Sequence, residues 1–352
     1  MALSSRTHIF ITGSGRCGTT LLRNLLDGHS RIEVIPGEAS DLIGEVWRNN
    51  GYSLSFRAAD PVMRVIRHHL LGCFDGLPCA EAVAGRFAEL LAAMGDDAWG
   101  LPDFLDAFLS RVVESDKDHV LIDLTNENIK GLLEQFPHAR IIHMLRDPFE
   151  TMNSHYRFRF ADANSFGGAF PGRWEFSESF ARVARAFDQA KAFSGHPAVH
   201  VLRLEDLQSE PEGKIRAALA FLGLEFEDIN DRQTRAGIDD FGNSTKERSA
   251  RVLAQASDIS CLTASDLHYI SCIRSARDFY SMPDSSRARN GFLAFAKRQL
   301  GYSGVKRGRP ASPGRFAKVL MIAWGQYIAD VAGKHYLQAA LNMEPFDDWP
   351  CL

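Results

Sequence analysis

The sequence IFITGSGRCGTTLL, residues 9–22, sets the architecture expected for the whole chain. Its apolar start predicts a buried strand, its glycine-rich middle predicts a tight turn, and its end has the apolar spacing of a helix. Such a turn aims free backbone N–H groups and the positive end of a helix dipole at one point. The glycines at 13, 15 and 18 let the backbone curl and approach a ligand closely. We therefore expect this turn to bind a phosphate or a phosphate–sulfate anhydride.

Three kinds of nucleotide-binding loop fit these residues, beside the alternative of a structural turn with no ligand. The nucleoside-triphosphate P-loop fits except at Thr19, which stands where that loop needs lysine. The dinucleotide pattern G-x-G-x-x-G also fits, and Glu33 follows Gly13 by 20 residues, near a second strand-like run. The residues Gly15 to Leu22 closely resemble the phosphosulfate-binding loop of the sulfotransferases, with Cys17 where serine is usual.

A second segment favours the sulfotransferases. Residues 139–148, ARIIHMLRDP, predict a strand that ends in charge and leads into a polar helix start. In sulfotransferases an arginine at such a strand end and a serine eight residues on bind the 3′-phosphate of the nucleotide, and Arg146 and Ser154 resemble that pair. An arginine supplies a planar fork of donors for phosphate oxygens. The alternative is a surface pair of Arg146 with Asp147 and a solvated serine.

Further blocks extend the resemblance, with gaps, from about residue 7 to about residue 280. Residues 199–207, VHVLRLEDL, and FLGL at 221–224 resemble a strand–helix block of the family, and residues 262–267 resemble another. The chain is thus identified as a member of the sulfotransferases that use 3′-phosphoadenosine 5′-phosphosulfate (PAPS), of the bacterial type, with some likeness to protein-tyrosine sulfotransferases around the loop. The resemblance implies that PAPS is bound by Ser14, Gly15, Arg16, Cys17, Gly18, Thr19, Thr20, Arg146, Ser154 and Lys246.

The apolar runs predict an α/β protein with a P-loop-like, central, mainly parallel sheet flanked by helices. The expected strands lie at about 7–12, 31–35, 119–123, 139–145 and 199–203. We expect a sulfotransferase domain over residues 1–284 with a helical insertion at about 40–115. Residues 285–352 are expected to form a helical C-terminal extension, packed on the core or on a second subunit. The aromatic-rich segment 154–179 is expected to be a packed loop or an acceptor-binding lid.

Bulk properties exclude several classes of function. A net charge of −4 disfavours a broad nucleic-acid-binding surface. No segment reaches the roughly 18 apolar residues of a membrane span, and the residues before the first strand are too few for a signal peptide. A cytoplasmic protein is therefore expected. Its expected partners are an acceptor substrate, which is a carbohydrate, lipid, peptide or small molecule, and a second copy in a possible homodimer. The six cysteines show no metal-ligand spacing and are interpreted as reduced thiols, so no metal is expected. Cys17 is interpreted as a space-filling replacement of serine rather than a redox thiol of lowered pKa.

Sulfuryl transfer resembles phosphoryl transfer, with the attacking and leaving atoms roughly in line. It requires positioning, charge stabilisation and a base for the acceptor proton. Glu38 follows the second strand, in a region that resembles the segment of bacterial and protein-tyrosine sulfotransferases that carries a catalytic glutamate. Glu38 is the expected base and Arg16 the expected charge stabiliser. His29, the other candidate base, fits better as a helix C-terminal cap.

One departure from the family pattern leaves alternatives open. Many relatives carry Asp-Lys-Thr-Pro where this chain has Asp-Leu-Thr-Asn at 123–126. Charge stabilisation must then come from Arg16, or from Lys246 and Arg248. A PAPS-binding or bisphosphate-binding protein without transfer activity, and a P-loop small-molecule kinase, remain alternatives. Carbohydrate, lipid, peptide tyrosine and phenol all remain possible acceptors, with a hydroxyl or an amine as the attacking group.

Overall fold

The computed structural model describes residues 6–161, 173–227, 234–239, 259, 262, 264–271 and 273–281. The chain divides into two compact units, one of Met1–Leu145 with Phe193–Ala254 and one of Arg146–Ala192 with Gln255–Leu352. Lys246, Arg248 and the expected C-terminal extension, residues 285–352, lie outside the described residues.

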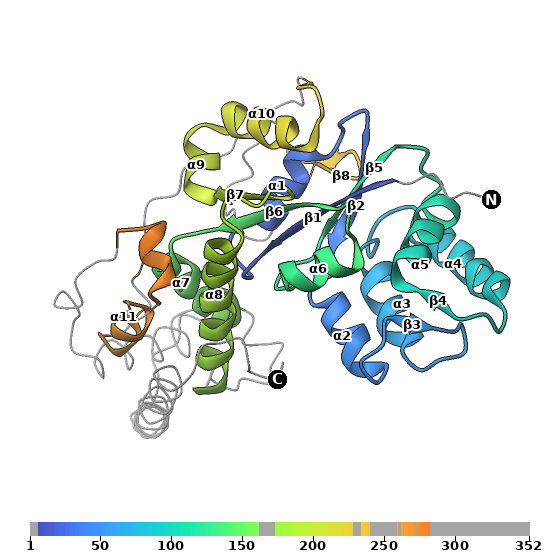
Figure 1. Cartoon of the computed structure of the whole chain (residues 1–352), viewed down its shortest axis with the longest axis horizontal. Coiled ribbons are helices and arrows are strands. Elements are labelled where there is room, and N and C mark those ends of the chain that lie inside the picture. The colour runs from blue at the N-terminus through green and yellow to red at the C-terminus, as the bar shows by residue number, and fades with distance from the viewer. Residues whose placement is uncertain are drawn as a thin grey trace, which may run out of the picture. The chain divides into compact units, whose positions relative to one another are not determined.

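A five-stranded parallel sheet forms the centre of the first unit (Figure 1). The strand order is β2-β5-β1-β6-β7, so β1 occupies the middle of the sheet. The strands match the five apolar runs of the sequence, and the predicted central parallel sheet is confirmed. Their bounds are β1 Thr7–Gly13, β2 Ile32–Glu38, β5 His119–Asp123, β6 Arg140–Leu145 and β7 Val199–Arg203.

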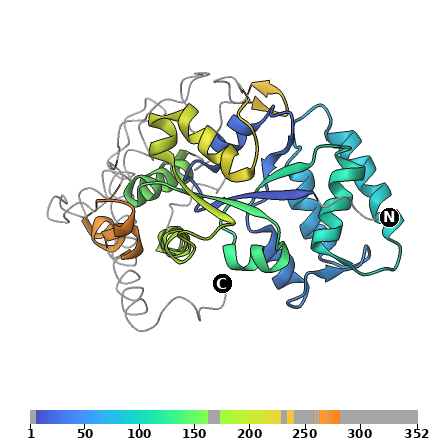
Figure 2. The same cartoon turned by 45° about the horizontal axis from the view of Figure 1, so that its top comes forward.

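Alternating side chains give this sheet two buried faces. Along β1, Ile9 and Ile11 pack with one apolar cluster and Phe10 packs with the other, as the two-residue period of a strand requires. The helices α1 (Thr19–Leu26), α9 (Leu204–Ser209) and α10 (Pro211–Leu222) cover the first face (Figure 2). The second face is covered by the segment between β2 and β5 together with α6 (Ile129–Gln135).

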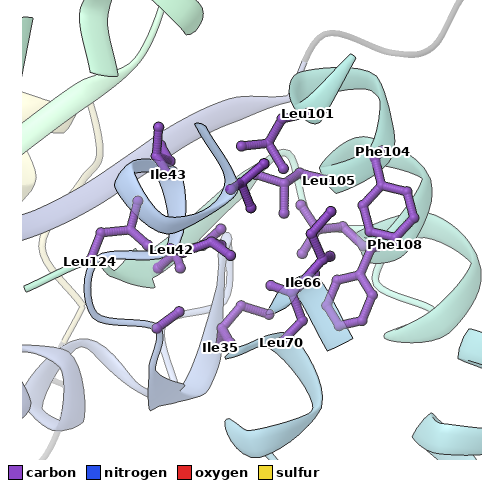
Figure 3. Close-up of a cluster of buried hydrophobic side chains, with 14 of the residues drawn as sticks. Ile35, Leu42, Ile43, Ile66, Leu70, Leu101, Phe104, Leu105, Phe108 and Leu124 are labelled. Carbon is purple, nitrogen blue, oxygen red and sulfur yellow. The ribbon is translucent and has the colours of Figure 1, made fainter. Parts of the chain in front are cut away.

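The segment between β2 and β5 is mostly helical. Pro61 and Pro78 precede two of its helices and Pro102 lies in the first turn of a third, where a missing N–H costs nothing. A close-up of the apolar cluster shows Leu42, Ile66 and Phe104 from three different helices pointing toward one another (Figure 3). Its elements are α2 Leu42–Asn49, β3 Ser55–Phe56, α3 Met63–Gly72, α4 Ala80–Met94, β4 Trp99–Gly100, α5 Leu101–Ala107 and a π-helix at Phe108–Val112.

The described part of the second unit is helical. It comprises α7 (Pro148–Ala161), α8 (Arg173–Ala192), α11 (Ala264–Ser271) and a 3₁₀ turn at Ser275–Asp278. The end of α8 is held to this turn by an ion pair of 2.9 Å between Lys191 and Asp278. Helices thus occupy both ends of the aromatic-rich segment for which the sequence predicted a loop or lid, and residues 162–172 of it lie outside the description.

Candidate anion-binding and catalytic site

The glycine-rich loop lies at the carboxyl end of β1 and leads directly into α1. Its backbone adopts positive φ at Gly13 (136°), Arg16 (70°) and Gly18 (99°), so the chain reverses within a few residues. A Cβ on Gly13 would approach the Met144 carbonyl oxygen to 2.4 Å, which only glycine avoids. The predicted strand–turn–helix arrangement is therefore present, with the amino end of α1 at the loop.

Asn126 ties this loop to the end of β5. Its side-chain Oδ1 accepts a hydrogen bond of 3.1 Å from the Gly15 N–H, and its own N–H donates to the Gly13 carbonyl at 2.7 Å. Asn126 adopts a φ of 71°, a conformation that asparagine tolerates better than most residues. The sequence marked position 126 only as a departure from the usual proline, whereas here it fixes the shape of the loop.

Cys17 fills space beneath the loop. Its side chain is fully buried and joins the apolar cluster on the α1 face of the sheet. Burial raises the pKa of this thiol far above its ordinary value, and the charges of Asp123 and Glu38 act in the same direction. The thiol therefore stays protonated, which supports the interpretation of Cys17 as a small filler and opposes a redox role.

Glu38 is the last residue of β2, so it lies at the carboxyl end of the sheet, as the glycine loop does. Its side chain is exposed and accepts a hydrogen bond from the Ser40 hydroxyl. The next residue, Ala39, donates its N–H to the Asp123 carbonyl at 2.8 Å, which fastens the strand end to β5. Gly37 leaves no room for a side chain, because a Cβ there would lie 2.3 Å from the Cα of Cys73.

A distant hairpin supports the end of β2. Arg235 donates from Nε to the Pro36 carbonyl at 2.7 Å and from Nη2 to the Cys73 carbonyl at 2.9 Å. The hairpin that carries it, β8 (Thr234–Arg235) with β9 (Ile238–Asp239), is itself fastened by Asp27, which accepts hydrogen bonds from Thr234 and from the Gly237 N–H. No pattern in the sequence signals this support, since about 200 residues separate Arg235 from β2.

Asp123 and Thr125 are site residues that the sequence reasoning missed. Asp123 is fully buried at the end of β5, between the loop strand and the Glu38 strand. Burial, followed by the nearby charge of Glu38, raises the pKa of Asp123 to about 7. The Thr125 hydroxyl donates to Asp123 Oδ1 at 2.8 Å and lies 3.1 Å from the Thr19 hydroxyl. The signal in the sequence that could have identified Asp123 was its place as a polar residue at the carboxyl end of a buried strand.

Leu124 stands where many relatives carry lysine, and its side chain belongs to the core. It is fully buried in the apolar cluster between β2 and β5 (Figure 3). Position 124 therefore brings no cation to the loop.

Two alternatives raised by the sequence lose their support. His29 is buried, its Nδ1 accepts from the Arg31 N–H at 3.1 Å, and its Nε2 then donates to the Glu225 carbonyl at 3.2 Å. Both ring nitrogens have structural partners, which favours a structural role for His29 over that of the base. Glu33 lies at the amino end of β2, and β5 separates β2 from β1, whereas a dinucleotide fold places those two strands side by side.

Arg146 and Ser154 belong to the second unit. Asp147 begins α7, since its Oδ1 accepts from the N–H groups of Phe149 (2.9 Å) and Glu150 (3.0 Å). Arg146 donates to Glu150 Oε2 at 3.1 Å, and both side chains are mostly buried. Ser154 lies about two turns into α7 and is half-buried. The residues from Ser14 to Thr20 lie with Glu38 at the carboxyl end of the sheet, while Arg146 precedes α7 and Ser154 lies within it.

No group of three or more histidine, cysteine, aspartate or glutamate side chains is placed to hold a metal ion within the described ranges. Across the same ranges, no helix has the length and apolar character needed to cross a membrane.

A central parallel strand that leads through a glycine loop into a helix defines a P-loop-like α/β fold. Within that class, the sequence of this chain matches one particular family. The sequence model of the sulfotransferase family matches residues 8–228, so the chain belongs to the sulfotransferase family.

Two curated relatives illustrate the similarity. The chain is 33% identical over 247 residues to the omega-hydroxy-beta-dihydromenaquinone-9 sulfotransferase Stf3 of Mycobacterium bovis, a match that covers 61% of this chain and 62% of the relative. It is 27% identical over 229 residues to an uncharacterized protein of Aquifex aeolicus, covering 64% of this chain and 26% of that protein. The chain thus spans less than two thirds of the length of either relative.

Among solved structures, the sulfotransferase domain from the curacin biosynthetic pathway is similar at a TM-score of 0.46 and 15% identity. That match covers 90% of this chain and 97% of the domain.

Proposed function

We propose that this protein is a PAPS-dependent sulfotransferase that moves a sulfuryl group to a hydroxyl, or an amine, of an acceptor. One observation carries the proposal: the glycine loop and the exposed carboxylate of Glu38 both lie at the carboxyl end of the strands of one parallel sheet. An anion-binding loop and a proton acceptor at one edge are the two parts that sulfuryl transfer needs.

In this proposal the loop binds the 5′-phosphosulfate, and Arg146 with Ser154 binds the 3′-phosphate. The arginine fork supports the second assignment, because its planar set of donors suits phosphate oxygens. The hydrogen bond from Arg146 to Glu150 orients this fork. Arg16 would stabilise charge on the transferring group. The proposed donor-binding residues are Ser14, Gly15, Arg16, Cys17, Gly18, Thr19, Thr20, Arg146, Ser154 and Lys246. The proposed sulfotransferase domain spans residues 1–284.

The proposed step forms one bond and breaks one. The acceptor oxygen attacks sulfur while the bond from sulfur to the 5′-phosphate oxygen breaks, with the two oxygens roughly in line. The acceptor proton passes to the Glu38 carboxylate, and adenosine 3′,5′-bisphosphate leaves with the electron pair of the broken bond. The chain's own residues supply charge stabilisation and the base, and the scheme requires no metal.

The acceptor is best sought first among apolar alcohols. The Mycobacterium bovis relative is named for a hydroxylated menaquinone derivative, and its 33% identity makes that chemistry a reasonable starting class. Carbohydrates, peptide tyrosines and phenols form the rest of the screen.

Two rivals make different predictions. A bisphosphate-binding protein without transfer activity would bind the nucleotide and turn nothing over, and the absence of a lysine at Leu124 is the observation that keeps this rival open. A P-loop kinase would need lysine at position 19, where this chain has a buried threonine that is hydrogen-bonded to Thr125.

Thermal denaturation with adenosine 3′,5′-bisphosphate, ATP with Mg²⁺, or NAD separates these functions, because a ligand that binds the native state raises the midpoint of unfolding. We expect a rise with the bisphosphate alone. Incubation with ³⁵S-labelled PAPS and an acceptor panel then separates the enzyme from the inactive binder. A rise with ATP but not with the bisphosphate would overturn the proposal.

A further inference from the structure

Three buried side chains form a continuous chain of hydrogen bonds from β5 to the loop. Thr125 donates its hydroxyl to Asp123 Oδ1 at 2.8 Å, and the Thr125 and Thr19 hydroxyl oxygens lie 3.1 Å apart. All three side chains are buried, with exposed fractions of 0% for Asp123, 1% for Thr125 and 4% for Thr19. Thr19 is the first residue of α1, so this chain ends at the proposed donor-binding loop.

Each hydroxyl has only one proton to donate, and this fixes the direction of the chain. When Asp123 is a carboxylate it can only accept, so Thr125 gives its proton to Asp123. Thr19 must then donate inward, to Thr125, for the hydrogen bond between the two hydroxyls to form. In that state the Thr19 oxygen offers an anionic ligand only its lone pairs.

A proton on Asp123 reverses the direction. The acid can then donate to Thr125, which releases its own proton toward Thr19. The proton of Thr19 becomes available to a phosphate or sulfate oxygen, which is the partner an anion requires. The remaining oxygen, Oδ2, has no hydrogen-bond partner among the residues described, and Arg23 Nη1 lies 4.0 Å from it. A carboxyl with an unpaired buried oxygen is poorly suited to carry charge.

We propose that Asp123 and Thr125 are positioning residues that set the direction of the Thr19 hydroxyl, so that donor binding is coupled to uptake of one proton by Asp123. The inference rests on the proposed function, since it assumes that the loop binds the donor nucleotide. Binding an anion next to Asp123 favours the protonated acid for a second reason, because a carboxylate there would repel the ligand.

The charged and titratable groups around Asp123 allow its carboxyl to be the group that gains or loses a proton near neutral pH. Glu38 faces it from β2 and disfavours its charge, while Arg23 faces it from α1 and favours its charge. The thiols of Cys17 in the loop and Cys73 at the end of α3 also lie near, but burial raises the pKa of both, to about 12 for Cys73. Both thiols therefore stay neutral throughout the neutral pH range.

The test is calorimetric titration with adenosine 3′,5′-bisphosphate in two buffers of different ionisation enthalpy, near pH 7.5, which counts the protons taken up on binding. We expect wild-type protein to take up more protons than Asp123→Asn, with a difference approaching one. The asparagine amide can donate to Thr125 as the protonated acid does. As pH rises above about 7, wild-type affinity should fall relative to that of Asp123→Asn, by up to about tenfold per pH unit.

Glu127→Gln is the matched control. Glu127 is a second buried carboxyl whose pKa burial raises to about 7, but it bonds to the backbone of α2 rather than to the hydroxyl chain. Glu127→Gln should take up as many protons on binding as wild type, because it leaves Asp123 and the hydroxyl chain unchanged. Titration of the ligand phosphates contributes equally to all the proteins. Thr125→Val, which cuts the chain at nearly constant volume but keeps Asp123, should take up fewer protons than wild type, and it replaces Asp123→Asn if that variant does not fold.

The outcomes separate this inference from the proposed function. Wild-type protein that binds the bisphosphate with the same proton uptake as Asp123→Asn and Thr125→Val would overturn the positioning role and leave the proposed function standing. Wild-type protein that does not bind the bisphosphate would overturn both.

Discussion

Glu38 lies opposite Asp123 across the parallel strands β2 and β5. The pairing is irregular, because Glu38 follows Val34 by four positions on β2 while Asp123 follows Leu121 by only two positions on β5. Such a bulge re-aims the residues at a strand end. An exposed carboxylate therefore stands beside a fully buried one. The exposed group is open to solvent, as the proposed base must be, while the buried group accepts a hydrogen bond from Thr125.

Glu38→Gln should retain donor binding and lose turnover by about 10²–10⁴-fold, the usual contribution of a general base. The change keeps the size of the side chain and removes the proton-accepting charge. Steady-state rates with an aliphatic alcohol acceptor measure the effect, since such an alcohol needs the base more than a phenol does. Glu33→Gln, at the other end of β2, is the control and should turn over normally. A near wild-type rate for Glu38→Gln would show that another group is the base.

Arg146→Ala should weaken binding of adenosine 3′,5′-bisphosphate by about 1.5–3 kcal/mol, the value of a charged hydrogen bond. Calorimetry measures the change. Arg140→Ala is the matched control, since Arg140 begins β6 and donates to the Pro197 carbonyl at 2.8 Å instead. Equal affinities for the two variants would remove Arg146 from the nucleotide site.

Gly37→Ala should lower the free energy of unfolding by about 1–3 kcal/mol, because overpacking forces neighbouring atoms to move. The new Cβ would meet backbone and side-chain atoms of Cys73 at 2.3–2.8 Å. Urea denaturation measures the loss. Gly85→Ala in α4 is the control, because nothing lies within 4 Å of its added Cβ and the change should be neutral or stabilising. If Gly37→Ala were as stable as Gly85→Ala, the close approach of β2 to α3 would be absent.

Glu127→Gln should flatten the dependence of stability on pH. Burial raises the pKa of Glu127 from 4.5 to about 7. Its folded-state pKa is thus above its unfolded value, so the stability it contributes is complete at low pH and is lost as pH rises from 4.5 to about 7. Relative to Glu127→Gln, wild type should lose roughly 3 kcal/mol across this window. The glutamine keeps an oxygen for the Ile43 N–H. Urea titrations at both ends of the window test this, and parallel curves would contradict it.

Local patterns in the sequence were sufficient for the elements that carry the loop and Glu38. The strand before Gly13, the turn and the helix after it depend on residues within about one element length, and so does the end of β2 at Glu38. Residue type and apolar spacing report such local structure directly, because alternation and glycine conformation are properties of short segments. The parallel sheet also followed from the apolar runs, since buried strands alternate with helices along the chain.

Only the tertiary structure placed β5 between β1 and β2, and with it Asp123, Thr125 and Asn126 beside the loop. It also brought Arg235 under the end of β2. Strand order and such distant supports are set by how whole faces pack against one another, which no local pattern encodes. The sequence could therefore predict an anion loop and a base, but the buried carboxyl between them became visible only once the strands were in order.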